Sequence, residues 1–233
     1  MALKFLGRGS GFADDHTSAY FVTENDEMVI LDCSITTFMK LKKKDLTNYK
    51  NFYILITHTH GDHIGGLGLF VQFVFFVLKK TAIIIAPSTE VLDDISTVLT
   101  IEGNESSYYE LVTAEQIAEK DWFGNCILTK HAPELENKCF GYHLIVAGIN
   151  TIYTGDTCTL DNFLPFLTDN SELYVDTSVY YGKIHLKLEN VLNDFINLTK
   201  RSIKVYLMHL DDVSVAEKIV ADIPGIEVVQ TVE

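Results

Sequence analysis

The stretch that decides the fold runs from residue 52 to residue 63 and reads FYILITHTHGDH. Its first part, residues 52–56, is an apolar, β-branched run that predicts a buried strand. Directly after that strand come the metal-ligand types His58, His60, Asp62 and His63. Imidazole and carboxylate groups suit zinc and similar divalent ions, and Gly61 lets the chain turn sharply between them. A histidine-rich surface loop without function is the weaker interpretation.

One loop cannot complete a two-metal site, so further ligands must come from other strand ends. His131 follows an expected strand at residues 126–130, and His209 follows one at 204–208. Asp156 comes after a strand at 151–154 that stops at a glycine. Loops held at strand ends are where sheet proteins present functional groups. Each residue alone would pass for an ordinary loop residue, but together with the first motif they indicate a site.

The order of the remaining elements predicts the fold class. Short strands dominate the first third of the chain, and strands then alternate with helices, among them expected helices at residues 67–80, 160–167 and 186–199. This order favours two packed sheets with helices outside, an α+β four-layer αββα sandwich, formed by a single domain spanning residues 1–233. The helix at 67–80 is apolar almost all round, which is typical of burial on more than one side.

Composition narrows the class of partner. The chain has 18 basic and 32 acidic residues, a formal net charge of −14, which disfavours long nucleic acid. Its 4 cysteines form no Cys-x-x-Cys pair and suggest reduced thiols. The apolar start is too short for a signal peptide, and the apolar stretch at residues 64–78 falls short of the ~20 residues that span a bilayer. We therefore expect a soluble, cytoplasmic protein without a membrane partner.

Nearly the whole chain, from Leu6-Gly7-Arg8-Gly9-Ser10-Gly11 onward, resembles the metallo-β-lactamase-fold hydrolases. The resemblance implies two divalent metal ions, zinc by first expectation, with manganese or iron as alternatives. It implies one ion bound by His58, His60 and His131, and a second bound by Asp62, His63 and His209. Asp156 and a hydroxide would bridge the ions. Two ions ~3.5–4 Å apart would lower the pKa of the bridging water, and Asp62 would orient or deprotonate it.

Sequence around the later ligands resembles the ribonuclease Z-like and cyclic-phosphodiesterase branch. His131-Ala-Pro-Glu leads to Gly141-Tyr142, and the chain returns as Tyr153-Thr-Gly-Asp-Thr. The Gly-His-Thr-Pro-Gly-His run of glyoxalase-type members is absent. That branch carries a non-ligand histidine in the loop where this chain has His185, which implies a catalytic role in stabilising phosphorane charge or protonating the leaving oxygen. A solvated loop histidine is the alternative.

The substrate expected from this resemblance is a small phosphodiester such as a cyclic nucleotide. The stretch between His131 and Asp156 has no room for the long basic arm with which ribonuclease Z grips tRNA. Three alternatives stay open: a thioester, lactone or amide hydrolase with the same site, a ribonuclease Z-like nuclease, and a non-catalytic metal-binding or nucleotide-sensing module. His16 is a further candidate for a contact with the substrate or with a metal ligand, whereas His143, inside an expected strand, is interpreted as a packing or surface residue. The apolar residues at 67–80 fit either burial within the monomer or a homodimer interface.

Overall fold

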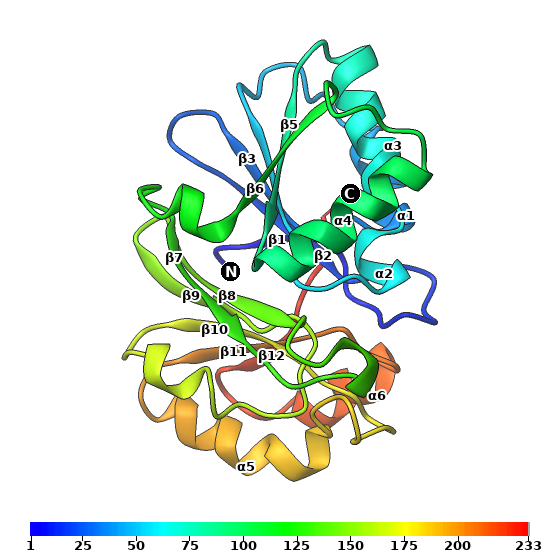
Figure 1. The fold of residues 1–233 in the computed structure, drawn as a ribbon. Coiled ribbons are helices and arrows are strands. Elements are labelled where there is room, and N and C mark those ends of the chain that lie inside the picture. The colour runs from blue at the N-terminus through cyan, green and yellow to red at the C-terminus, as the bar shows by residue number, and fades with distance from the viewer. Residues whose placement is uncertain (233) are drawn as a thin grey trace.

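The computed structural model describes residues 1–232, and its centre is a pair of six-stranded sheets packed together with helices outside (Figure 1). The first sheet has the order β1-β2-β3-β4-β5-β6 and the second the order β12-β11-β10-β9-β8-β7. Within residues 1–232, no helix combines the length and apolarity that crossing a bilayer requires. The predicted αββα sandwich is confirmed.

The first sheet changes from antiparallel to parallel pairing along its width. β1, β2 and β3 pair antiparallel, and β3 to β6 pair parallel. Parallel strands need crossover connections, and helices supply them here. The strands are β1 Lys4–Gly7, β2 Ser18–Val22, β3 Met28–Leu31, β4 Phe52–Leu55, β5 Ala82–Ala86 and β6 Tyr109–Thr113.

The second sheet repeats this plan. β7, β8 and β9 pair antiparallel, and β9 to β12 pair parallel. Both halves of the chain therefore begin as a meander and end as crossover units. The strands are β7 Phe123–Leu128, β8 Phe140–Val146, β9 Ile149–Tyr153, β10 Glu172–Asp176, β11 Lys204–Met208 and β12 Ile226–Val228.

Helices cover the outer face of each sheet and create three apolar cores. One core lies between the first sheet and its helices, one between the two sheets, and one between the second sheet and its helices. On the first sheet these helices are α1 Ile35–Leu41, α3 Leu67–Gln72 and α4 Thr89–Ile101, and on the second they are α5 Leu188–Thr199 and α6 Val213–Val220.

The helix expected at residues 67–80 is wrong in length and regularity. After α3 the chain continues as a π-helix, η1 Phe73–Val77, and the amide of Leu78 donates to the Phe73 carbonyl at 3.2 Å. The wider turn lets Phe75 and Phe76 pack on Tyr108, with ring centroids 4.6 and 4.9 Å away. Burial on more than one side also fails, because Phe76 is 50% exposed.

Two further expectations need correction. The helix expected at residues 160–167 is only a single 3₁₀ turn, η4 Leu164–Phe166, with Pro165 inside it. Pro165 cannot donate the amide hydrogen bond that a continuous helix over residues 160–167 would need at that position, and it disfavours a helical residue before it. Conversely, part of the expected loop after β4 is a short helix, α2 Gly61–Ile64.

Candidate metal centre

The ligand-rich segment begins where β4 leaves the first sheet. His60 stands at the N-cap of α2, so Asp62 and His63 lie in the single turn of that helix. His58 and His63 are buried, and His60 is half-buried. The strand fixes the start of the segment and the helical turn fixes its end. One short stretch therefore brings several imidazoles close to His131 and Asp156, which follow strands of the second sheet.

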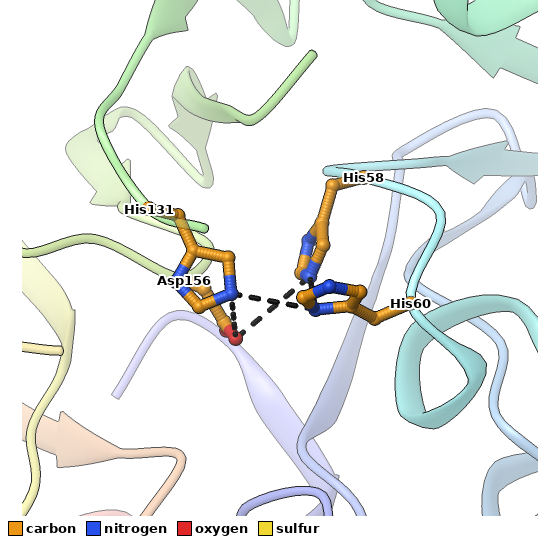
Figure 2. Close-up of side chains that lie close together, drawn as sticks. All are labelled: His58, His60, His131 and Asp156. Atoms are coloured by element: carbon orange, nitrogen blue, oxygen red, sulfur yellow. Dashed lines mark hydrogen bonds and ion pairs between the residues drawn. The ribbon is translucent and has the colours of Figure 1, made fainter. Parts of the chain in front are cut away.

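A first group of ligand-type side chains is formed by His58, His60, His131 and Asp156 (Figure 2). One ligand atom from each lies within 4.8 Å of the others. His58 Nε2 is 3.0 Å from His60 Nδ1, and His131 Nε2 is 3.5 Å from an Asp156 oxygen. His58 and His60 come from the first half of the chain and His131 and Asp156 from the second, so the group joins the two sheets.

A second group consists of Asp62, His63, Asp156 and His209, again with ligand atoms within 4.8 Å of one another. His63 Nε2 is 3.3 Å from Asp156 Oδ1, and His209 Nε2 is 3.3 Å from Asp62 Oδ2. Asp156 belongs to both groups and is buried. The seven residues predicted from the sequence are thus brought together, and Asp156 occupies the shared position.

Burial and nearby charges shift the pKa values of the ligand-type histidines in opposite directions. Burial and neighbouring His63 lower the pKa of His58 well below its usual value. Burial also lowers the pKa of His209, but Asp156, Asp176 and Asp62 outweigh it and raise the value to about 10. The pKa of His63 is likewise raised, because Asp156 and Asp32 outweigh its burial. The carboxylates around His63 and His209 therefore favour positive charge at these imidazoles, and the same carboxylates would stabilise a divalent cation.

The residues fit divalent metal ions. His63 Nε2 is a buried atom that finds no hydrogen-bond partner within residues 1–232, although two carboxylates lie nearby. A buried nitrogen of this kind costs free energy unless a ligand satisfies it. Nitrogen and oxygen donors without thiolate suit zinc, manganese or iron.

Asp32 is a site residue that the sequence interpretation missed. It follows β3, is fully buried, and its Oδ2 accepts a hydrogen bond from His63 Nδ1 at 2.9 Å. It also accepts from the amide of Thr57 at 2.8 Å and from the Thr57 hydroxyl at 2.8 Å. A carboxylate on the far nitrogen of a metal-binding histidine fixes its tautomer and orientation. The position of Asp32 at a strand end was the available signal.

His185 lies beside the two groups. Its Nδ1 is 2.7 Å from Asp176 Oδ2, and its ring centroid is 5.0 Å from those of His131 and His209. Burial lowers the pKa of His185, but the Asp176 carboxylate outweighs it, and the net shift is upward. Asp176, which sequence reasoning left aside, also faces His209 Nδ1 at 3.4 Å.

His16 and His143, the other two histidines considered from the sequence, have different surroundings. Burial lowers the pKa of His16, and the Asp62 carboxylate opposes that shift. A substrate contact by His16 stays a prediction. His143 lies on β8 and is half-buried, with its ring centroid 5.5 Å from that of Phe166.

Backbone geometry at the site is unusual in two places. Asp32 and His209 both have positive φ, at 60° and 57°, a conformation that non-glycine residues adopt at a cost. The amide of His209 donates to Thr17 Oγ1 at 2.9 Å, which helps to hold the strained turn. Close approach matters at Gly11, where a Cβ would lie 2.9 Å from Asp62 Oδ2.

Comparison with known proteins gives one family. The family model described as "Anti-Pycsar protein Apyc1" matches residues 1–223. The chain is 25% identical over 236 residues to the anti-Pycsar protein Apyc1 of Bacillus phage 010DV004, covering 91% of this chain and 90% of that protein. It is 27% identical over 158 residues to ribonuclease Z of Lactococcus lactis subsp. lactis, covering 62% of this chain and 50% of that protein.

A solved structure shows the same fold. The metallo-β-lactamase fold protein YhfI from Bacillus subtilis superposes with a TM-score of 0.74 at 15% identity, covering 98% of this chain and 96% of that chain. Three observations point to the same class of protein: the fold, the cluster of aspartates and histidines, and the family match over residues 1–223. The chain therefore belongs to the anti-Pycsar protein Apyc1 family, and it is a metal-dependent hydrolase with the metallo-β-lactamase fold.

Proposed function

We propose that this enzyme hydrolyses a small phosphodiester, a cyclic nucleotide in particular. The observation that carries the proposal is the contact between His185 Nδ1 and Asp176 Oδ2 at 2.7 Å, beside the ligand cluster. An imidazole held by a carboxylate is suited to donate a proton to a leaving oxygen. Membership of the Apyc1 family and the likeness to a ribonuclease Z support phosphodiester chemistry.

We further propose how the ions are held. His58, His60 and His131 would bind one ion, Asp62, His63 and His209 the other, and Asp156 both, because it is the member common to the two groups. Zinc is the first candidate, since a nitrogen-rich set of ligands suits it. Metal analysis of the purified protein tests this assignment, and fewer than about two ions per chain would contradict it.

The residues of the chain then have distinct tasks. When bound, divalent ions supply an activated water and polarise the phosphoryl oxygens. Asp62 Oδ2 lies 3.4 Å from His63 Nε2 and 3.3 Å from His209 Nε2, so its carboxylate can orient the attacking water. His185 uses Nδ1 for Asp176, which leaves Nε2 to give its proton to the leaving oxygen as the phosphorus–oxygen bond breaks.

The test is hydrolysis of cyclic mononucleotides and bis-(p-nitrophenyl) phosphate by protein reconstituted with Zn²⁺ or Mn²⁺. We expect turnover of both phosphodiesters. A parallel panel holds a lactone, a thioester and a linear RNA, so that each alternative substrate class is measured in the same assay. No turnover of either phosphodiester, with cleavage of the lactone or thioester, would reject the proposal.

The variant His185→Ala separates the enzyme classes. We expect a loss of about 10²–10⁴ in kcat on a cyclic nucleotide. An ester or thioester hydrolase that relies on the metal site alone would keep nearly all its activity. Equal rates for wild type and variant on the cyclic nucleotide would remove His185 from the mechanism.

We also propose a homodimer in the cytoplasm. The exposed apolar side chains Leu69, Phe76 and Val77 lie on α3 and η1, and Ile101, 80% exposed, ends α4. Apolar surface of this kind favours association of two copies. Phe76→Asp should turn a dimer into a monomer in light scattering, and a wild-type monomer at micromolar concentration would contradict the proposed dimer.

The proposed compartment, the cytoplasm, is supported by the four free cysteines, because reduced thiols are typical of a reducing compartment.

A further inference from the structure

The loop at residues 178–187, here named the histidine loop, is closed at its base by main-chain hydrogen bonds. The amide of Ser178 donates to the Leu186 carbonyl at 2.8 Å, and the amide of Leu188 donates to the Ser178 carbonyl at 2.9 Å. Its tip reaches solvent, where Tyr181 is 70% exposed. The base joins the two ends of the loop, and a second attachment holds the first part of the loop, residues 178–180.

That attachment is the carboxylate of Asp211. It accepts hydrogen bonds from the Ser178 hydroxyl at 2.6 Å, the Val179 amide at 2.7 Å and the Tyr180 amide at 3.0 Å. Hydrogen bonds to a carboxylate are about twice as strong as neutral ones. Asp211 lies two residues after His209, so the loop is fastened to the segment that carries a proposed ligand.

The histidine loop places two imidazoles. Its Ile184 carbonyl accepts a hydrogen bond from His131 Nδ1 at 2.8 Å, which orients that ring. Its next residue is His185, held on Asp176 at 2.7 Å. A shift of the loop would therefore move His185, the proposed proton donor, and a misplacement of about 1 Å can cost about 10²-fold in rate. Any loosening of His131, a proposed metal ligand, would be offset by saturating metal ion, because it acts on metal affinity.

We infer that Asp211 is a positioning residue that holds the histidine loop so that His185 delivers its proton to the leaving oxygen. The inference rests on the proposed function. Asp211 acts through the three groups of Ser178, Val179 and Tyr180 that its carboxylate binds. Without the carboxylate, these two amides and one hydroxyl would donate to water instead, and the loop would lose its fixed position.

Two substrates that differ in their leaving group test this role. A cyclic nucleotide releases an alkoxide, which needs a proton, whereas bis-(p-nitrophenyl) phosphate releases a weakly basic phenolate that leaves without one. With saturating Mn²⁺, we expect Asp211→Ala to lower kcat about tenfold or more on the cyclic nucleotide and less than about twofold on the phenolate ester. Asp211→Asn, which keeps one acceptor oxygen, should fall between Asp211→Ala and wild type.

Asp212 gives the matched control. Its carboxylate accepts from the Tyr180 hydroxyl at 2.8 Å and caps α6 through the Val215 amide, but the main chain of the histidine loop is held by Asp211. Asp212→Ala should lower the melting temperature and leave the ratio of the two kcat values unchanged. Equal losses on both substrates for Asp211→Ala would show general damage to the site and overturn the inference.

His185→Ala separates this inference from the proposed function. If His185→Ala loses kcat on the cyclic nucleotide but not on the phenolate ester, and neither Asp211 variant shows this difference, the positioning role of Asp211 is wrong. The role of His185 then stands. If His185→Ala keeps the wild-type kcat on the cyclic nucleotide, His185 is not the proton donor. The inference about Asp211 is then wrong as well.

Discussion

His63 Nδ1 lies 2.9 Å from Asp32 Oδ2, and both side chains are buried. The two residues are 31 positions apart and follow neighbouring strands of the first sheet. Because Asp32 also accepts the amide and hydroxyl of Thr57, its oxygens are fixed before any ion binds. The pair therefore sets which nitrogen of His63 is left to face Asp156.

Replacing this carboxylate should weaken metal binding. In Asp32→Asn the amide NH₂ group would face a donor, either His63 Nδ1–H or the Thr57 amide, so His63 would lose its fixed orientation. We expect metal affinity to fall by about 10–100-fold, measured by competition with a chelator. Asp26→Asn is the control, because Asp26 is an exposed turn residue paired with Lys50. Unchanged affinity in Asp32→Asn would show that Asp32 serves only the fold.

A second prediction concerns the glycine turn against Asp62. In Gly11→Ala the new methyl would lie 2.9 Å from Asp62 Oδ2 and displace a proposed ligand. We expect kcat to fall by about tenfold or more, since small misplacements at a reacting centre cost that much. The matched control is Gly61→Ala. The turn expected at Gly61 is the start of helix α2 and has no positive φ, and a Cβ there meets nothing within 4 Å. Equal activities of the two variants would contradict close packing at Gly11.

Metal binding should depend on pH. The pKa of His209 is raised to about 10 in the metal-free protein, so at neutral pH this imidazole carries a proton that an ion must displace. Apparent affinity should therefore rise as pH increases toward that value, by about tenfold per pH unit for each proton displaced. Calorimetry in buffers of different ionisation enthalpy measures the proton release. An affinity that is flat between about pH 6 and pH 8 would argue against His209 as a ligand.

The N-cap of α4 offers a stability test away from the site. Ser88 Oγ accepts a hydrogen bond from the Val91 amide at 3.3 Å. Ser88→Ala should cost about 1 kcal/mol of unfolding free energy, or roughly 2–4 °C in melting temperature, without changing kcat. The same substitution at Ser96, inside the helix, should be neutral or stabilising because alanine is the better helix former there. A larger loss at Ser96 would contradict the capping role.

The amino-acid sequence by itself predicted the sandwich and the seven candidate ligands, for a physical reason. A buried strand has a characteristic apolar pattern, and ligand-type residues at its end stand out against it, as at His58 to His63 or at Asp156. Such signals are local, so they are readable without knowing what packs against them. The catalytic assignment of His185 came from resemblance, and it stays a proposal.

Only the tertiary structure decided the residues that act through distant partners. Asp32, Asp176 and Asp211 gain their meaning from contacts with His63, His185 and the histidine loop, and an isolated aspartate after a strand carries no sign of such a partner. The same holds for the π-helix η1 after α3, where Phe75 and Phe76 pack on Tyr108. Periodicity reports the preference of one segment, whereas long-range packing and buried charge select the geometry that the folded chain adopts.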